Sequence, residues 1–383
     1  MKTPIFILFA ALSMAAANAE SPAEISIRKA QAEIAKRPAY YAPYNGLAMA
    51  YARRARETSD VHFYDEAERA VRKSLELSPD NLEALKVQTW LLLGKHEFAA
   101  ALDLAAKINR KVPDDVTVYG YLVDANAELG NYQDAVRAAQ WMLDLRPGNI
   151  PGLTRAAYLR ELHGRIPGAI DLMQRALDAT PLSESEDRAW LLTQMAHLHL
   201  LEGNLAKAET CANGALAVFP RYHYALGALG QVRMTQQRFA DAVTLFEQRY
   251  QAAPHAENLF ALATAFQAAG KTAEAKEAFG DFERKALAES TKADNANHEL
   301  IAYYTDYAGN PAKALEIARQ ELTRRHDVFT LDAYAWALAS SGDYANASVE
   351  MKKALAIGTK DPRLLQHAAA IATQTPAAGA GGD

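Results

Sequence analysis

The sequence contains a single cysteine, Cys211, and no long run of apolar residues after its N-terminal segment. A lone cysteine excludes an intramolecular disulfide framework. No later stretch approaches the roughly 20 consecutive apolar residues that a membrane-spanning helix needs. Cys211 falls within a predicted helix, and we interpret it as a small, partly buried apolar residue and not as a redox thiol.

A strong excess of one charge is also missing. The 383 residues include 41 Lys and Arg against 46 Asp and Glu, which gives a net charge of −5 at pH 7. Proteins that bind nucleic acid need a basic face. The mildly acidic composition therefore argues against a nucleic acid as the partner.

The motifs of catalysis and metal binding are scarce. There is no G-x-S-x-G, no phosphate-binding G-x-x-x-x-G-K and no C-x-x-C. The pair His298-Glu299 begins the zinc-protease motif H-E-x-x-H, but Ala302 occupies the second histidine position, and the similar start at His96 fails in the same way. We expect His199 to be packed and hydrogen-bonded. The sequence thus predicts no metal, no cofactor and no enzymatic activity.

What the chain does contain is a regular spacing of proline. Within each interval a turn falls about halfway, a small residue follows it, and proline closes the unit; the unit Val116–Pro147, for example, carries Gly130 and Ala135. A fixed period of this kind is typical of repeat proteins. The prolines are 34 residues apart at Pro79, Pro113, Pro147 and Pro181, with Pro220 after a five-residue insertion and Pro254 another 34 residues on.

Physical reasons support two helices in each unit. Apolar residues recur at helical spacing, and a lone helix pair cannot bury its apolar face, so the units must stack. Proline ends the second helix because it lacks an N–H group and clashes with the preceding turn. The small residue after each turn should lie where the two helices approach most closely. These residues are Ala135, Ala169, Ala208, Ala242, Ala314 and Ala347.

The 34-residue period with this punctuation resembles the tetratricopeptide repeat (TPR) family. The resemblance covers about residues 44–361 and implies an all-α fold, a right-handed superhelical solenoid of about nine helix-turn-helix repeats. Together with the composition of the two ends of the chain, it predicts five segments. They are a signal peptide (1–19), an N-terminal capping helix and linker (20–43), the solenoid (44–361), a C-terminal capping helix (362–373) and a disordered tail (374–383).

Three local features refine this organisation. Ser21 and Glu24 form a capping-box pattern at the start of the N-terminal helix, and Ser183 with Glu186 forms a similar pattern after the five-residue insertion. The seventh repeat is irregular, because no proline closes it and the polar run Ser290–Asn297 follows. We expect this repeat to be the weakest joint.

The N-terminus carries the features of an export signal. Lys2 precedes the largely apolar stretch Pro4–Met14, and Ala17-Asn18-Ala19 offers small residues for signal peptidase. No cysteine follows that could carry a lipid. We predict cleavage after Ala19 and an exported protein, in the periplasm or secreted.

The resemblance also implies a function, the binding of a protein or peptide in a concave groove lined by the first helix of each repeat. Residues at the second, fifth, ninth and twelfth places of that helix tend to face the ligand. They form an acidic and aromatic surface that suits a segment carrying Lys or Arg. The predicted site residues are Asp124, Tyr158, Glu161, Trp190, His197, Tyr224, Gln231, Glu299, Tyr303, Asp306, Asp332 and Trp336.

Several alternatives stay open. Any of the aromatic side chains could instead pack between repeats, and Trp336 could be buried against the terminal helix. Arg160 and Arg233 could pair with carboxylates on a neighbouring helix or reach into the groove. The protein could also be an envelope-associated hydrolase with an unrecognised site, or a structural subunit of an envelope assembly. The oligomeric state is undetermined.

Overall fold

The computed structural model describes residues 20–292 and 294–374. Every regular element in this part of the chain is a helix, which confirms the all-α prediction. None of these helices is long and apolar enough to cross a bilayer. The predicted signal peptide (1–19) and nearly all of the predicted tail (375–383) lie outside the described residues.

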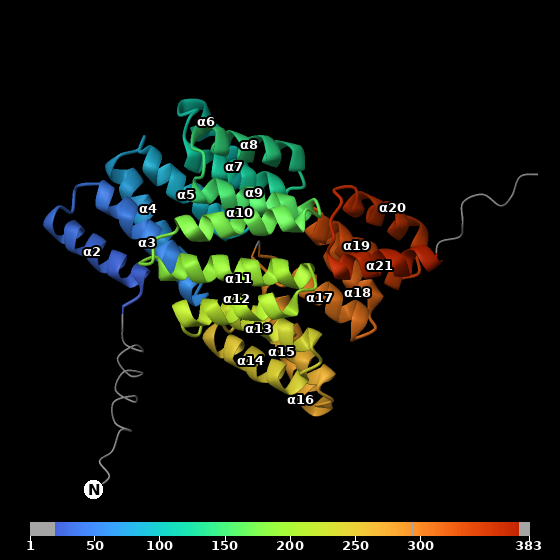
Figure 1. Ribbon diagram of the computed structural model, residues 1–383. Coiled ribbons are helices and arrows are strands. Elements are labelled where there is room, and N and C mark those ends of the chain that lie inside the picture. Colours follow the sequence, from blue (N-terminus) through green and yellow to red (C-terminus); the bar gives the residue numbers. More distant parts are fainter. Residues whose placement is uncertain (1–19, 293, 375–383) are drawn as a thin grey trace, which may run out of the picture. The chain divides into compact units, whose positions relative to one another are not determined.

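The chain divides into two compact units, Met1–Val87 and Gln88–Asp383. The helices follow one another through short connections (Figure 1). Those that begin in the first unit are α2 (Pro22–Lys36), α3 (Ala42–Thr58), α4 (His62–Leu77) and α5 (Leu82–Gly94), which runs across the unit boundary. Those of the second unit are α6 (Phe98–Lys111), α7 (Val116–Glu128), α8 (Tyr132–Leu145), α9 (Ile150–Leu162), α10 (Ile166–Ala179), α11 (Ser185–Leu201), α12 (Leu205–Val218), α13 (His223–Thr235), α14 (Phe239–Ala252), α15 (Ala256–Ala268), α16 (Thr272–Glu289), α17 (Asn297–Asp306), α18 (Pro311–Glu321), α19 (Val328–Ser340), α20 (Tyr344–Leu355) and α21 (Pro362–Gln374).

In the first unit, α2 begins as the sequence predicts. Ser21 accepts a hydrogen bond from the Glu24 N–H, and the Glu24 carboxylate accepts one from the Ser21 N–H, with Pro22 at the first helical position. The Ala23 N–H donates to the buried carboxylate of Glu57 at 3.2 Å. The start of α2 is therefore tied to the end of α3.

Taken two at a time in chain order, the helices from α3 to α20 form nine pairs among the described residues, α3/α4 to α19/α20, as predicted. The turn glycines Gly130 and Gly164 have φ values of +79° and +67°, a conformation that glycine adopts at little cost. The small residue after the turn is fully buried in each of the predicted cases. Relative exposure is 0% for Ala135, Ala169, Ala208, Ala242, Ala314 and Ala347.

The five-residue insertion lengthens a helix. α11 has 17 residues, whereas α9 and α13 have 13 each. Its N-cap residue is Glu184, and no side chain caps it. Glu186 is buried and accepts a 2.6 Å hydrogen bond from the Tyr222 hydroxyl. The predicted capping box with Ser183 is wrong, because this carboxylate links neighbouring repeats instead.

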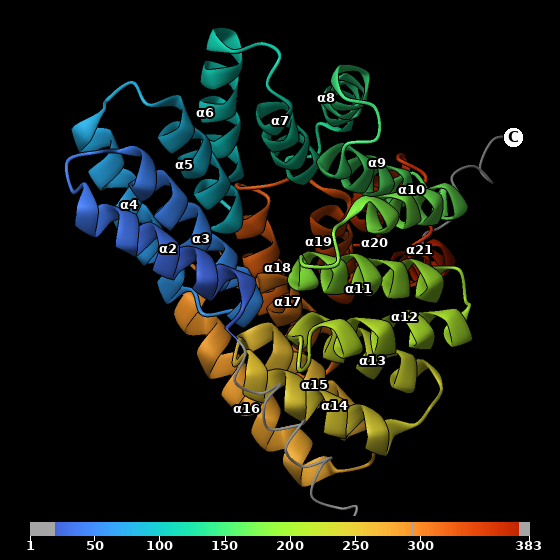
Figure 2. The same cartoon turned by 60° about the vertical axis from the view of Figure 1, so that its left-hand side comes forward.

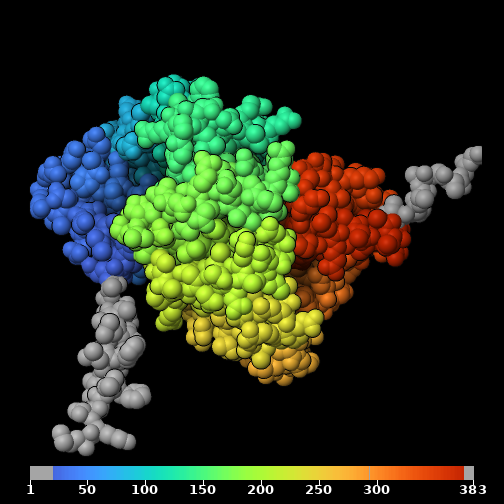
Figure 3. Space-filling view, viewed as in Figure 1, coloured from blue at the N-terminus to red at the C-terminus, as the bar shows by residue number. Residues whose placement is uncertain are grey.

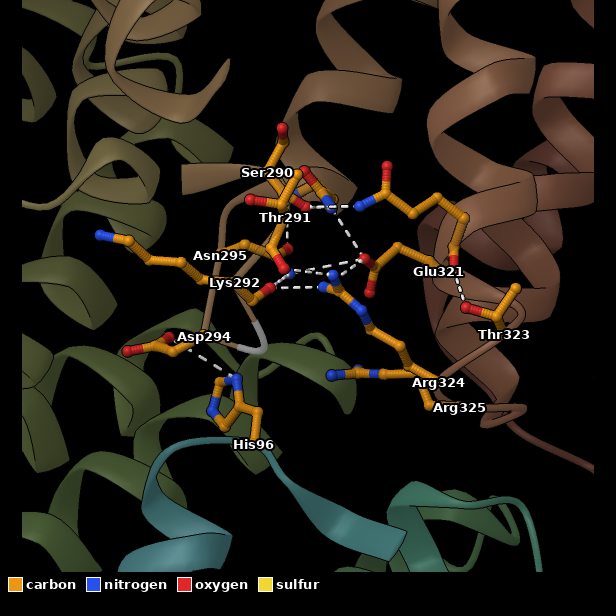
Figure 4. A network of polar contacts seen from close by, with 12 residues as sticks. His96, Ser290, Thr291, Lys292, Asp294, Asn295, Glu321, Thr323, Arg324 and Arg325 are labelled. Atoms are coloured by element: carbon orange, nitrogen blue, oxygen red, sulfur yellow. Dashed lines mark hydrogen bonds and ion pairs between the residues drawn. The ribbon is translucent and has the colours of Figure 1, made fainter. Parts of the chain in front are cut away.

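The irregular seventh pair ends in α16, which has 18 residues. The connection that follows is bonded to the end of α18: Gln320 donates to the carbonyl of Ser290 and Arg324 to that of Thr291, both at 2.7 Å. On its other side Asp294 lies 3.6 Å from His96 (Figure 4). Side-chain hydrogen bonds thus hold the connection that in the first six pairs contains a proline.

One hydrophobic cluster of the second unit joins early and late repeats. It contains Met142 and Leu162 from α8 and α9 together with Leu338, Met351 and Ile371 from α19, α20 and α21. Figures 1 and 2 show α19–α21 beside the ends of α9 and α10, and Figure 3 shows the C-terminal residues directly against that region. The second unit therefore curves far enough for its last repeats to meet the third and fourth.

Candidate functional site

A cavity of about 420 Å³ lies along the first helices of three successive pairs, α11, α13 and α15. His197, Tyr224 and Gln231, three of the predicted site residues, line it. The wall mixes amide, hydroxyl and aromatic groups. Its residues are Thr193, Gln194, His197, Leu200, Tyr224, Gly227, Ala228, Gln231, Phe246, Arg249 and Ala261.

Two of the lining residues come from a second helix. Phe246 and Arg249 belong to α14, and their side chains pack against two glycines of α13. A Cβ at Gly230 would lie 2.7 Å from the Phe246 ring, and one at Gly227 would lie 3.0 Å from the Arg249 Nε. Sequence reasoning missed both α14 residues, although glycines three apart inside a helix were a usable signal of close approach.

Arg249 is the cation of this cavity. Its Nη2 lies 3.4 Å from a carboxylate oxygen of Glu257, and its buried Nε has no hydrogen-bond partner. Burial lowers the pKa of Arg249, since charge is disfavoured away from water. The side chain therefore places a poorly solvated donor group at the cavity wall.

His197 connects the cavity to the preceding repeat. Its Nε2 lies 2.8 Å from a carboxylate oxygen of Glu161, another predicted site residue. Burial alone lowers the pKa of His197, but the hydrogen bond and charge of Glu161 outweigh it and raise the pKa. Tyr224 is 36% exposed and packs against His223 at a ring distance of 3.9 Å.

Two of the predicted acidic residues have internal cationic partners. Asp124 accepts a 2.5 Å hydrogen bond from Arg155, which also donates to the Gly120 carbonyl. Asp306 accepts a 2.7 Å bond from the Trp336 indole and lies 3.7 Å from Arg363. Much of the acidic character expected of the groove is therefore neutralised within the protein.

Asp332 does not face a groove as the helical register predicted, and Trp336 stacks on the terminal helix. Asp332 is only 8% exposed and lies 2.9 Å from the Nδ1 of His367 on α21. The Trp336 ring stacks on the His367 ring, with centroids 4.3 Å apart and planes 4° from parallel. The terminal helix packs on this face of α19, and Trp336 lies against it half-buried, not buried as the alternative stated.

The remaining aromatic site residues also pack between repeats. Tyr158 contacts the cluster that joins early and late repeats, and its hydroxyl lies 3.4 Å from Glu128. Trp190 packs against two hydrophobic clusters around α11. Tyr303 stacks on Phe279 at 5.4 Å. Each of these rings stabilises the stack of helices.

Glu299 has a raised pKa. Burial is the main cause that raises its pKa to about 7, and the nearby charge of Glu257 raises it further, whereas Arg363 and Arg249 lower it. Its carboxyl group therefore changes charge near neutral pH.

Arg160 and Arg233, which occupy positions next to the groove residues, bond to groups of the protein itself. Arg233 donates from both terminal nitrogens to Glu209 on α12, at 2.7 and 2.6 Å, and this pairing lowers the pKa of Glu209 to about 2. Arg160 donates to the Gly168 carbonyl at 3.2 Å. The alternative in which Arg233 pairs with a carboxylate on a neighbouring helix is the one observed.

The residues considered for chemistry have packed environments. His199 is buried and lies 3.3 Å from Glu202, as expected. The Nε2 of His298 lies 3.1 Å from the Thr330 hydroxyl, and burial lowers the pKa of His298 to about 4. Cys211 is partly buried, which raises its thiol pKa. Within the described ranges, no group of three or more His, Cys, Asp or Glu residues could hold a metal ion.

Fold and cavity together define a class of protein, an all-α solenoid of helix-turn-helix repeats with a polar cavity along its first helices. A family model for the tetratricopeptide repeat matches residues 87–150, 122–184 and 193–257. The chain therefore contains tetratricopeptide repeats over these residues. A comparison with curated proteins found no match.

Two solved structures with TM-scores above 0.5 share the fold. A chain of the APC/C hetero-tetramer Cut9-Hcn1 superposes with a TM-score of 0.53 at 14% identity, over 85% of this chain and 55% of that one. This protein thus spans about half the length of that chain. A monomeric mutant of IFIT1 with Gppp-AAAA gives 0.52 at 15% identity, over 82% and 81%. A thermophilic TPR protein of Thermus thermophilus gives 0.42 at 19%, over 49% and 99%.

Proposed function

We propose that this protein is a non-catalytic interaction scaffold that binds a polypeptide segment in the cavity along α11, α13 and α15. One observation carries the proposal: hydrogen-bonding side chains from successive repeats, such as Gln194, Tyr224 and Gln231, line a single cavity. Its volume, about 420 Å³, lies within the usual range for ligand sites. Stacked helices are about 8–10 Å apart, so roughly three residues of an extended bound segment would span each repeat.

The partner segment that we propose carries a Lys or Arg. Asp124, Asp306 and Asp332 each contact a basic side chain of the protein itself. Glu299 differs, because its raised pKa, about 7, leaves its carboxyl group partly protonated at neutral pH. Glu299 does not line the cavity, but the charge of Arg249, which does, acts on it. A cation of the segment next to Glu299 would lower the pKa of this carboxyl group and favour its charged form. Tyr224 offers an exposed ring to the same segment.

Matched pairs of glutamines test the site. The double variant Gln194→Ala/Gln231→Ala removes two amides from the cavity, whereas Gln248→Ala/Gln251→Ala removes two exposed amides of α14 that do not line it. A partner polypeptide is first isolated by affinity capture, and its dissociation constant is then measured by calorimetry. We expect a loss of at least about tenfold for the first pair, since two hydrogen bonds contribute roughly 1 kcal/mol each.

The control pair should bind within about twofold of wild type. Equal affinities for all three proteins would overturn the proposal. A loss confined to Gln248→Ala/Gln251→Ala would instead favour an outer contact, as in a structural subunit of an assembly.

A further inference from the structure

The C-terminal repeats approach two turns of the earlier repeats at backbone distance. Gly130 and Gly164 end the first helices of the third and fourth pairs. A Cβ on Gly130 would lie 2.5 Å from the carbonyl oxygen of His326, and one on Gly164 would clash with the carbonyl oxygen of Gly358 and lie 2.8 Å from Lys360 Cγ. These two glycines are therefore required for the contact as well as for the turn.

Side chains reinforce the same contact. The backbone N–H of the buried Val328 donates to the Tyr132 hydroxyl at 2.8 Å. Arg325 lies 3.6 Å from Glu128 and 2.7 Å from Asp327, which in turn caps the start of α19. The segment that leads into α19 is thus bonded to the turn of the third pair. We define the contacts of residues 325–328 and 358–360 with the turns at 128–132 and 164 as the clasp.

The clasp lies over part of the face that the sequence predicted to bind ligand. Tyr158 packs against the cluster that contains Val328 and bonds Glu128, which pairs with Arg325. The Glu161 side chain is 13% exposed, and the charge of Asp361 acts on its partner His197. Tyr158 and Glu161 of α9 are therefore partly covered, whereas no clasp residue lines the cavity along α11, α13 and α15.

We infer that the C-terminal repeats are an autoinhibitory clasp, which restricts a bound polypeptide to the cavity and must release α9 before the ligand can extend onto Tyr158 and Glu161. This inference rests on the proposed function for its ligand. The clasp itself can be measured without one. In the closed form the ligand cannot contact the α9 face. The apparent affinity of the protein for the extended ligand therefore falls with the fraction of molecules that are open.

Turn glycines give a matched test of the clasp. Gly164→Ala combines backbone strain with a clash against Gly358, whereas Gly203→Ala has the same kind of strain, at φ +78°, with no atom within 4 Å of the new Cβ. Spin labels at Arg165→Cys and Gln366→Cys, in a Cys211→Ser background, report the distance across the clasp by pulsed electron paramagnetic resonance. We expect one narrow distance in the parent and in Gly203→Ala, and an added longer component in Gly164→Ala.

A second variant protects the test from a folding defect. Tyr132→Phe removes the acceptor of the Val328 N–H and should also add the longer component, with unchanged helical circular dichroism. The captured polypeptide should then bind Gly164→Ala and Tyr132→Phe at least threefold more tightly than Gly203→Ala. A single narrow distance in both variants overturns the inference, and so does a longer distance without tighter binding. Failure of the proposed function would appear separately, as unchanged binding in Gln194→Ala/Gln231→Ala.

Discussion

At the scale of single residues, two glycines in α13 decide which side chains reach the cavity. Gly227 and Gly230 leave room for Arg249 and Phe246 of α14. The sequence could predict Gln231, because first-helix places carry over from repeat to repeat. It could not predict Arg249, which reaches the same wall from a second helix through the space that a missing Cβ leaves.

Gly230→Ala should destabilise the protein by about 1–3 kcal/mol, because the new methyl group meets the rigid Phe246 ring at 2.7 Å. The matched control is Gly280→Ala in α16, where nothing lies within 4 Å. That change should stabilise by about 0.5–1 kcal/mol, since alanine favours helix more than glycine. Urea denaturation measures both. A stable Gly230→Ala would mean that Phe246 does not occupy this position.

The ionisation of Glu128 should make stability depend on pH. Burial raises its pKa to about 7, and the groups that face it are Arg325, Asp327, Asp124, Tyr158 and Tyr132. Between the unfolded pKa and about pH 7 the folded state binds more protons at this carboxyl, so its contribution to stability falls as pH rises.

Glu128→Gln removes that contribution. Relative to wild type, we expect little difference at pH 5 and a gain of the order of 1–3 kcal/mol at pH 8, measured by urea denaturation at both values. The comparison cancels the opposite effect of the buried His298, which is common to both proteins. An equal difference at the two pH values contradicts the raised pKa.

At the scale of elements, the turns and contact residues were predictable because each repeat encodes them locally. Gly130 and Ala135 recur in equivalent places of the other repeats, and the helices begin and end around them. The predicted capping box at Ser183 failed because a short-range pattern could not reveal that Tyr222, 36 residues beyond Glu186, takes the carboxylate. The seventh repeat remains our predicted weakest joint.

Substitution of a buried alanine tests the repeat packing. Ala208→Leu and Ala135→Leu should each lower the free energy of unfolding by about 1–3 kcal/mol, since both sites are fully buried between helices. Ala206→Leu, at an exposed position of the same helix as Ala208, should change it by less than about 0.5 kcal/mol. Equal midpoints for the three variants in guanidinium melts would contradict the register of the repeats.

At the scale of the whole molecule, the clasp could not be predicted from the repeats. The contact of Gly164 with Gly358 spans residues from the fourth and last pairs, and it depends on the summed rotation between successive repeats. The sequence pattern of a repeat predicts that neighbouring repeats stack. It does not predict the curvature of the whole array, which brings distant repeats together. Asp332 was assigned to a groove for a more local reason. The helical register gives the face of α19 on which it lies, but not that the terminal helix α21 packs against this face.

The leader predicts where the mature chain begins. Lys2, the apolar stretch and Ala17-Asn18-Ala19 should direct export and cleavage, so that the mature N-terminus is Glu20. Expression of the full chain in a bacterium, fractionation and N-terminal sequencing check this. An intact Met1 on a cytoplasmic product would contradict the export proposal.

The central claim, that the cavity along α11, α13 and α15 binds a polypeptide, is tested most directly by site-specific photo-crosslinking. A benzophenone side chain is placed at Gln231, in the cavity, or at Gln248, exposed on α14 outside it. Each protein is irradiated with the affinity-captured polypeptide, and the products are mapped by mass spectrometry. We predict a crosslink from position 231 and none from position 248. A crosslink from 248 alone, with binding intact, would contradict the account.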